Sequence, residues 1–558
     1  MALISAKNIV PDLKRAIVRF PLTCVSLVIL CVTVIVLNHL TNDIDGHIQL
    51  FIIFYSASVA ILSISLKLWS EQVTSRRLSI TVQAVAHAML LLFSIWVGFI
   101  AEFDSNYDDL LTASVSVLII LSVWALPFLK RKDDRPQWHF MARTVVNLII
   151  SNIIATVFML SISLLLFCVD SLFSLNMSSS VFTDVYVISL LLIQPLAFLF
   201  LMPSVEFIKS GLPTAGKLIR VLANYLLLPI TGLYMLTLYA YAAKILINWQ
   251  LPDGGVCWLV VALIAALLVL IFLVFPFRGQ EDQKLSQFIL RWLPVAVLPL
   301  LVLMSVAIGR RISDYGLTIP RLYLLLFNIW AYVVCIIFFI TRTKRFSWVI
   351  TSFALGFFIT SIGPWSVSNI TLHSISSNLT QTLNAAGYSK LPLTLDQFSQ
   401  FLSKLKPEQK QSVISQLSYL RYTFTEKDAA VFVIDPSEAI YQHDDSEAKS
   451  PYYVWQNRML TGRSYSIPQN GLKHFAIIDV DSVSYSHTAT TIQFTIPSGS
   501  TSYNFIVPTS KVNELKNGMY DSAAKPELVI KSSQGPIFYV DFINADQQHI
   551  SLRGILFY

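Results

Sequence analysis

The stretch VCWLVVALIAALLVLIFLVFPF, residues 256–277, contains no charged side chain. A run of about 20 apolar residues is long enough to cross the hydrocarbon core of a bilayer as an α-helix. Similar runs recur from Phe20 to about Trp365, and none follows Trp365. The sequence therefore predicts an α-helical polytopic membrane bundle over residues 20–365, with a different kind of structure after it.

Composition excludes a soluble globular protein. Hydrophobic residues make up 55% of the 558 positions and charged residues only 13%, against about 25% charged in soluble domains. The mean hydropathy is +0.63, a value that would leave large apolar patches exposed to water. We therefore expect the lipid bilayer to be the main partner of this chain.

Eleven membrane spans are expected. They cover residues 20–40, 48–68, 80–101, 110–129, 143–169, 183–203, 221–243, 256–277, 289–308, 322–341 and 347–365. The connections between most of them are short, so that consecutive helices should pack antiparallel. Each helix satisfies its own backbone hydrogen bonds, as a segment in lipid must.

The basic residues predict the orientation. Of the 25 Lys and Arg residues before position 366, 21 fall on one side of these spans and only Lys244, Arg310, Arg311 and Arg321 on the other. Basic residues gather on the cytoplasmic side of membrane proteins. Residues 1–19 are thus a basic cytoplasmic segment, and an odd number of spans puts residues 366–558 outside the cytoplasm. Because the basic excess belongs to the membrane module, no nucleic-acid partner is expected.

The C-terminal region is expected to form an α+β extracytoplasmic domain. Residues 366–425 predict a helical stalk, in which Thr394 and Gln397 form a capping box and Pro407 begins a helix. Residues 426–558 are β-rich, with an irregular part at 436–472 and an antiparallel sheet of five or six strands. The expected strands are 474–480, 490–496, 503–507, 527–531, 537–543 and 549–553, with a hairpin turn at 497–500.

Several motifs of the membrane module resemble a known bacterial family. They are RFP at 19–21, YLLLP at 225–229, LYAYAAK at 238–244, IGRRISDYGLT at 308–318 and SIGPWS at 361–366. Together they resemble the multi-pass membrane proteins called domain of unknown function 4153, and the similarity fades after about residue 425. The resemblance implies a bacterial cytoplasmic (inner) membrane location and no particular activity.

Four acidic residues in the first two outer loops are candidate catalytic groups: Asp43, Asp45, Glu102 and Asp104. Paired carboxylates can bind a metal or act as a general base, as in membrane transferases that use lipid-linked substrates. The alternative is that outer loops are acidic because basic residues are excluded from them.

Two further sets of residues are candidate sites. His87 is the ionisable group expected deep within a span, where such a residue marks a functional site or bonds to a neighbouring helix. Arg310, Arg311 and Asp314 break the orientation pattern in an outer loop. We expect them to clamp the outer acidic loops or the base of the C-terminal region, or to contact lipid headgroups.

No motif in the sequence predicts a cofactor or a metal site. GLPTAGK at 211–217 matches the start of a phosphate-binding loop, but Leu218 stands where Ser or Thr should follow. We expect a non-enzymatic envelope protein that acts in interaction, sensing or assembly through residues 366–558, with an envelope protein as possible partner. A membrane transferase and a transporter or lipid-handling protein are the alternatives.

Overall fold

The computed structural model describes residues 9–39, 45–101, 106–204, 217–248, 255–278 and 284–443, except for positions 130, 132, 174, 176 and 389. In the C-terminal region it describes residues 453–456, 475–487, 491–498, 501–508, 528–532, 535–545 and 549–557. The chain forms two compact units, Met1–Ser437 and Glu438–Tyr558. The two units are described separately below.

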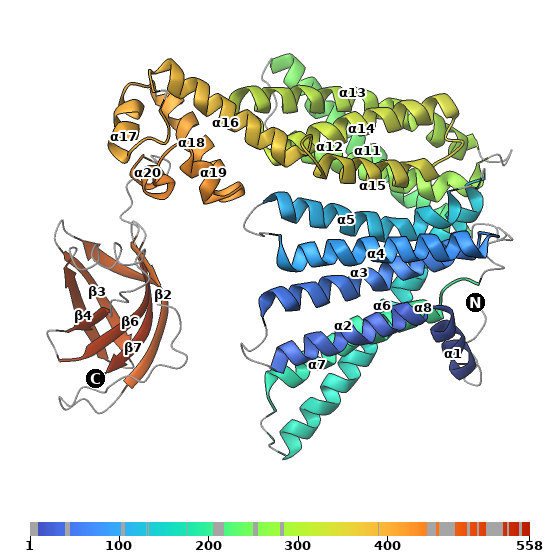
Figure 1. Ribbon diagram of the computed structural model, residues 1–558, viewed down its shortest axis with the longest axis horizontal. Coiled ribbons are helices and arrows are strands. Elements are labelled where there is room, and N and C mark those ends of the chain that lie inside the picture. The colour runs from blue at the N-terminus through green and yellow to red at the C-terminus, as the bar shows by residue number, and fades with distance from the viewer. Residues whose placement is uncertain are drawn as a thin grey trace. The chain divides into compact units, whose positions relative to one another are not determined.

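The first unit is helical (Figure 1). Its membrane module consists of α1 (Ile9–Arg19), α2 (Pro21–His39), α3 (Gly46–Ser70), α4 (Arg76–Phe99), α5 (Asn106–Ala125), η2 (Leu126–Phe128), α6 (Arg135–Phe173), α7 (Ser179–Ile188), η3 (Ser189–Ile193), α8 (Gln194–Phe200), α10 (Lys217–Val221), η4 (Leu222–Leu227), α11 (Leu228–Asn248), α12 (Gly255–Val274), η5 (Phe275–Phe277), α13 (Lys284–Tyr315), α14 (Ile319–Thr341) and α15 (Ser347–Ser361). Its stalk consists of α16 (Val367–Ala385), α17 (Leu395–Ser403), α18 (Pro407–Thr423), α19 (Glu426–Ala430) and the start of α20 (Pro436–His443).

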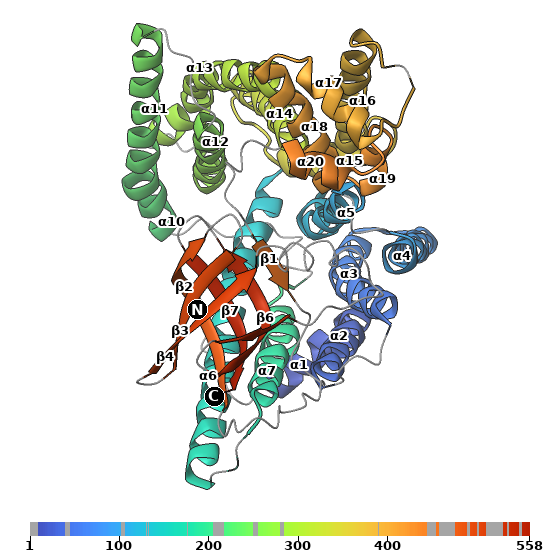
Figure 2. The same cartoon turned by 90° about the vertical axis from the view of Figure 1, so that its left-hand side faces the viewer.

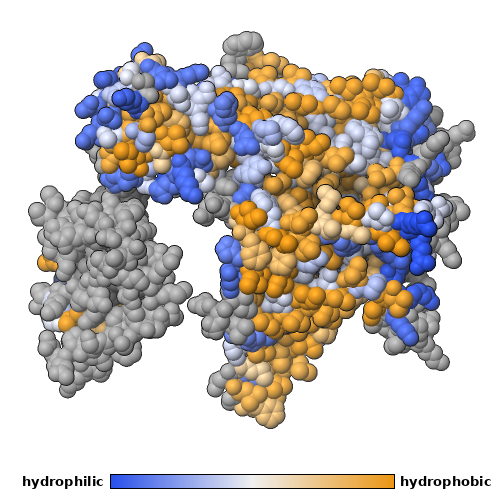
Figure 3. Space-filling model, in the orientation of Figure 1, coloured by the Kyte–Doolittle hydropathy of each residue, from blue (hydrophilic) through white to orange (hydrophobic). Residues whose placement is uncertain are grey.

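Ten helical segments among the described residues are long and apolar enough to cross a membrane. They coincide with the first ten expected spans. The eleventh expected span, 347–365, contains α15, an apolar helix of only 15 residues. At 1.5 Å per residue α15 is about 22 Å long, less than the ~30 Å hydrocarbon core. Apolar side chains cover the helices in Figure 3, and hydrophilic ones gather at the end of the bundle near α1.

Within the N-terminal helix set, α1–α8, the helices α2, α4 and α5 pack against α3, and small polar residues lie at these contacts. Four serines of α3 are buried, at positions 56, 58, 63 and 65. Thr23 of α2 shares a hydrogen bond with Ser63, at 2.7 Å between the oxygens, and Ser122 of α5 donates to Ser65 at 2.9 Å. Small residues at such positions let helices approach closely, and hydroxyls bond across the interface.

Gly98 shows how close this approach is. A Cβ atom at Gly98 of α4 would lie 2.6 Å from the Cβ atom of Phe51 on α3. His47, also on α3, bonds through Nδ1 to the Gly98 carbonyl oxygen at 2.8 Å. A side chain at position 98 would therefore force α3 and α4 apart.

In the C-terminal helix set, α10–α14, the helices α11 and α13 pack against α12, which contains the stretch quoted first. Seven α12 side chains from Val260 to Val274 are at most 1% exposed: Val260, Leu263, Ile264, Leu267, Leu270, Ile271 and Val274. They recur at intervals of three and four residues and form one buried face of α12, whereas Trp258 and Val269 on the opposite side are exposed. A helix that is apolar on both sides is typical of a membrane span, whose outer face meets lipid. Across the α13–α14 interface, Asn328 donates to Ser305 at 2.6 Å.

The stalk forms as expected at its helix starts. Thr394 and Gln397 form the capping box at the start of α17, and Pro407 is the first residue of α18. The helical region extends beyond the expected limit of residue 425 through α19 and α20. The expectation that 436–472 is irregular is wrong at two places, because α20 and the strand β1 (Tyr453–Gln456) lie there.

The second unit contains an antiparallel sheet of seven strands. After β1 come β2 (Phe475–His487), β3 (Thr491–Ser498), β4 (Thr501–Pro508), β5 (Leu528–Lys531), β6 (Ile537–Ala545) and β7 (His549–Phe557). Their order is β1-β6-β7-β2-β3-β4, and β5 also pairs with β6. The expected hairpin joins β3 to β4, with Ser498 opposite Thr501. Phe494, Phe505 and Phe538 are at most 1% exposed and form an aromatic core.

Candidate functional site

Charged and polar side chains link the helices at the end of the bundle where α1 meets α2. Arg19 donates to both carboxylate oxygens of Glu71, at 2.9 and 2.7 Å, and to the Pro203 carbonyl at 2.7 Å. Arg131 donates to the side chain of Gln72 at 3.0 Å. These contacts join the end of α1, the end of α3, the end of α8 and the connection between α5 and α6.

The Asp134 carboxylate is the most enclosed charge of this network. Its side chain is 2% exposed. It accepts hydrogen bonds from the backbone amides of Phe346 and Ser347 at 2.7 and 2.8 Å, and from Arg345 Nε at 3.3 Å. Asp134 thus satisfies two amides at the start of α15, where a helix favours negative charge.

Arg345 is held against the α5–α6 connection by two contacts. Besides the bond from Nε to Asp134, its Nη2 donates to the Arg131 carbonyl at 3.1 Å. The side chain is still 53% exposed. The neighbouring Phe346 is buried against Phe275, with 4.7 Å between the ring centroids. The start of α15 therefore touches both helix sets.

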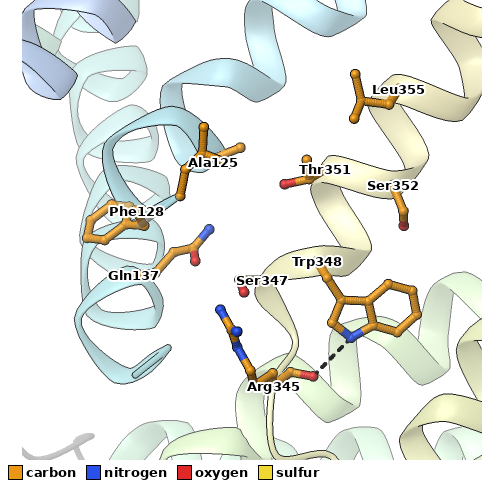
Figure 4. A pocket seen from close by; sticks show the side chains of 10 residues that line it. Ala125, Phe128, Gln137, Arg345, Ser347, Trp348, Thr351, Ser352 and Leu355 are labelled. Atoms are coloured by element: carbon orange, nitrogen blue, oxygen red, sulfur yellow. Dashed lines mark hydrogen bonds between the residues drawn. The ribbon is translucent and has the colours of Figure 1, made fainter. Parts of the chain in front are cut away.

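A cavity of about 340 Å³ lies between α15 and the α5–α6 region. Its lining residues are Ala125, Phe128, Leu129, Gln137, Arg345, Ser347, Trp348, Thr351, Ser352 and Leu355. Figure 4 shows the Arg345 guanidinium directed between Gln137 and Ser347, and the Thr351 hydroxyl directed toward the gap. Figure 2, which views many helices nearly end-on, shows α15 beside α5.

The cavity has a polar end and an apolar end. Ser347, Thr351 and Leu355 line it at intervals of four residues, which puts them on one face of α15. Ser347 and Thr351, the two nearest to Arg345, carry hydroxyl groups, whereas Leu355 further along the helix carries an apolar side chain. The arrangement can hold an anion at one end and apolar groups at the other.

A second cavity, of about 380 Å³, separates α15 from α14. Aromatic side chains keep the two helices apart: Trp330 and Phe353 lie 5.3 Å apart and Tyr323 and Phe357 lie 5.5 Å apart, measured between ring centroids. Trp330 Nε1 donates to Ser352 at 3.1 Å. This cavity is lined mainly by apolar atoms, so it differs from the one at Arg345.

The stalk contacts the opposite end of α14. The Tyr419 hydroxyl on α18 accepts a hydrogen bond from the Ile319 amide, the first residue of α14, at 3.0 Å. Burial raises the pKa of the Tyr419 phenol above its ordinary value, although the Ile319 amide and the Arg321 charge act in the other direction. Arg321 itself donates to the Gly316 carbonyl at 2.8 Å.

One of the four candidate outer-loop acids is described. Asp45 is the N-cap of α3, and its carboxylate accepts from the His47 amide at 3.0 Å. Asp43, Glu102 and Asp104 lie outside the described residues, as do residues 211–216 of the expected phosphate-loop-like segment. The structure therefore gives Asp45 a helix-capping contact and does not test the acidic pairs.

His87 lies at the middle of α4. Its Nδ1 bonds to the Gln83 carbonyl of the same helix at 2.8 Å, rather than to a neighbouring helix as expected. A carbonyl accepts only, so Nδ1 carries the proton. Nε2 is buried without a hydrogen-bond partner among the described residues. Two other polar side chains do bond between helices: Asn147 donates to the Leu201 carbonyl at 2.5 Å and Gln194 to Ser151 at 3.4 Å.

Arg310, Arg311 and Asp314 belong to the last two turns of α13 rather than to a loop. The side chains of Arg310 and Arg311 are exposed. The structure describes the backbone of Asp314 but not its side chain. The α13 helix ends at Tyr315, and the chain reaches Ile319 and its contact with Tyr419 through Gly316, whose φ is +76°.

The sequence reasoning missed Asp134. Asp134 could have been noticed in the sequence KRKDDR, residues 130–135, because two aspartates interrupt an otherwise basic connection between two spans. Such a carboxylate is expected either to be solvated or to find a partner inside the protein. Among the described residues, no group of three or more His, Cys, Asp and Glu side chains is placed to hold a metal ion.

Ten apolar helices linked by polar contacts at their ends define a multi-pass membrane protein. The chain belongs to the family described as Domain of unknown function (DUF4153), which matches residues 25–409. This confirms the expected membership.

An uncharacterized protein of Pasteurella multocida (strain Pm70) is 25% identical over 246 residues. The match covers 43% of this chain and 40% of that relative. The chain therefore spans well under half the length of that curated relative. No solved structure matches the chain.

Proposed function

We propose that this protein resides in the bacterial cytoplasmic membrane with its N-terminus in the cytoplasm, and holds its stalk and C-terminal domain on the extracytoplasmic side. Its role is non-enzymatic: residues 438–558 bind or sense another envelope component, or assemble with it. The observation that supports the proposed orientation is the contact of Tyr419 in the stalk with the start of α14, at the other end of this helix from Arg345.

The two ends of α14 differ in their surroundings. Tyr419 of the stalk bonds to Ile319 at its start, whereas Arg345 follows four residues after its last residue, Thr341. The helix has 23 residues, a length of about 34 Å, which exceeds the hydrocarbon core. The stalk and the Arg345 region are therefore at opposite ends of a helix long enough to cross the membrane.

This geometry supports an outward stalk whether or not α15 crosses the membrane. The basic network of Arg19, Arg131 and Arg345 corresponds to the side that carries 21 of the 25 basic residues of the membrane module, and basic residues favour the cytoplasmic side. The helix α15 then leads back from Arg345 to Ser361, where Tyr323 of α14 bonds to it at 2.9 Å. The short α15 can serve as the eleventh crossing if the bilayer is locally thin.

Accessibility of two introduced cysteines tests the orientation. Ser415→Cys lies at an exposed position of α18, and Thr74→Cys lies at an exposed position between α3 and α4, at the basic end. A membrane-impermeant maleimide should label Ser415→Cys in cells whose outer membrane has been permeabilised, and Thr74→Cys only after lysis. The unaltered protein, with its five cysteines, provides the background. The reverse labelling pattern would show that the proposed orientation is wrong.

A comparison of partners tests the proposed role. The full-length protein and a chain ending at Ser437 are purified from native membranes after cross-linking, and the captured proteins are compared. We expect envelope proteins that bind through residues 438–558 to be captured with the full-length protein and to be missing from the proteins captured with the shorter chain. If both chains capture the same proteins, the C-terminal domain is not the interaction module.

A further inference from the structure

We propose that the cavity beside Arg345 binds an anionic phospholipid, with the phosphate at Arg345 and the start of an acyl chain along Leu355. This inference goes beyond the proposed function and does not depend on the side occupied by the C-terminal domain. It rests on three observations: an oriented cation, a change from polar to apolar lining, and the position of the cavity in the bundle.

The cation is oriented and incompletely paired. Asp134 binds Nε of Arg345 and the Arg131 carbonyl binds Nη2, whereas Nη1 has no partner among the described residues. These two contacts restrict the rotation of the guanidinium, which Figure 4 shows at the polar end of the cavity. An arginine whose orientation is already restricted loses less conformational entropy when it binds a phosphate.

Asp134 does not neutralise this region. The Asp134 carboxylate is also shared with the amides of Phe346 and Ser347. Arg278 donates to the backbone carbonyl of residue 344, next to Arg345, at 2.7 Å. The two guanidinium groups of Arg345 and Arg278 therefore outnumber the single buried carboxylate of Asp134. An anionic headgroup complements this charge better than a zwitterionic one, whose amine would be repelled.

The lining favours a lipid over a free anion. Ser347 and Thr351 supply hydroxyl groups next to Arg345, and Ala125 and Leu355 supply apolar surface further along. Trp348 also lines the cavity and donates its indole N–H to the Arg345 carbonyl at 3.2 Å. Tryptophan is enriched at the level of lipid headgroups. A volume of about 340 Å³ exceeds the need of a phosphate alone and lies within the range of ligand sites.

The position in the bundle agrees with this occupant. Arg345 follows the last residue of a membrane-crossing helix by four positions, which puts it at headgroup depth rather than in the hydrocarbon core. Basic pockets between membrane helices at this depth bind the headgroups of anionic lipids. The apolar end of the cavity extends from there along α15, in the direction that an acyl chain takes.

Lipid titration of the purified full-length protein in detergent tests the proposal. Phosphatidylglycerol is added, and binding is followed by the rise in melting temperature and by native mass spectrometry. Phosphatidylcholine, inorganic phosphate and glycerol 3-phosphate are the comparison ligands. We expect phosphatidylglycerol to stabilise the protein at lower concentrations than phosphatidylcholine does, and the two soluble phosphates to have little effect.

Variants connect this response to the cavity. Arg345→Gln should weaken phosphatidylglycerol binding at least about tenfold, as expected for loss of a charge-assisted contact. The matched control Lys344→Gln removes an adjacent charge that does not line the cavity and should change binding less than about twofold. Ala125→Trp should also weaken binding, because it fills the cavity and leaves the pair of Arg345 and Asp134 in place. If Arg345→Gln does not fold, the Ala125→Trp variant still tests whether the cavity binds the lipid.

Four outcomes would overturn the proposal. Arg345→Gln and Lys344→Gln could bind phosphatidylglycerol equally well, or Ala125→Trp could bind as the unaltered protein does. Phosphatidylcholine could be as effective as phosphatidylglycerol, which would remove the argument from charge. Inorganic phosphate could reproduce the full stabilisation, which would make this a site for a free anion.

Discussion

Asp134 and Arg345 lie 211 residues apart in the sequence and form an ion pair, with 3.3 Å between Asp134 Oδ1 and Arg345 Nε. The other oxygen of the same carboxylate accepts the amides of Phe346 and Ser347. One buried side chain in the α5–α6 connection thereby holds the start of α15 and forms part of the support for the cavity.

Asp134→Asn should destabilise the protein. Both oxygens of the Asp134 carboxylate accept hydrogen bonds, from Arg345 or from the two amides. In asparagine an NH₂ group replaces one of these oxygens, so two donors would face each other. Hydrogen bonds to charged groups contribute about 1.5–3 kcal/mol, and we expect a loss in that range by thermal unfolding in detergent. Asp133→Asn is the matched control, because Asp133 is exposed. Equal melting of the two variants would contradict the assigned role.

Arg19→Lys should also lower stability, although it conserves the charge. Lysine cannot form the paired bonds to both Glu71 oxygens and reach the Pro203 carbonyl as well. The side chains of Arg19 and Glu71 are 17% and 11% exposed, so solvent screens the pair only in part. We expect a loss of about 1 kcal/mol or more. Arg77→Lys, at an exposed position, should leave the melting temperature unchanged.

Attachment of the stalk should weaken in alkaline solution. Burial raises the pKa of the Tyr419 phenol in the folded protein above the ordinary tyrosine value of about 10. The stabilisation is then fully present below pH 10 and is lost as the pH rises through the folded pKa, because the unfolded state ionises first. Limited proteolysis of α18 should accelerate above about pH 10. Tyr419→Phe should lose part of this pH dependence and protect α18 less at neutral pH.

Substitutions at Asp45 distinguish a helix cap from a catalytic carboxylate. Ser is a good N-cap residue, whereas Ala costs about 1 kcal/mol at such a position. If Asp45 only caps α3, Asp45→Ser should keep both stability and cellular function, and Asp45→Ala should be less stable. If Asp45→Ser folds normally but abolishes a cellular phenotype that depends on this protein, the carboxylate has a chemical role.

The charges at the end of α13 are expected to help hold the stalk. We predict that Arg310→Ala together with Arg311→Ala lowers the melting temperature and increases protease cleavage of the stalk. Exposed pairs contribute about 0–1 kcal/mol each, so the effect should be smaller than that of Asp134→Asn. Lys244→Ala is the matched control, because Lys244 is also basic and exposed and is expected on the same side of the membrane. The clamp hypothesis fails if the double variant behaves like Lys244→Ala.

Local patterns in the sequence predicted much of the fold. The first ten spans coincide with ten helical segments, because the length and apolarity needed to cross a membrane are properties of one continuous stretch. The capping box at Thr394 and the hairpin between β3 and β4 were predictable for the same reason. The strand β1 and the helix α20 were missed, since they are short and lie in a polar segment with weak periodicity.

The candidate site depended on contacts that no local pattern contains. The amino-acid sequence alone was enough to predict a multi-pass membrane protein, the approximate positions of its first ten spans and its membership of the DUF4153 family. The contact of Asp134 with Arg345, the contact of Tyr419 with Ile319 and the cavity beside α15 became visible only in the folded chain. A membrane helix satisfies its own backbone hydrogen bonds within one stretch of sequence, whereas a buried charge at a helix end needs a partner that packing brings from a distant part of the chain.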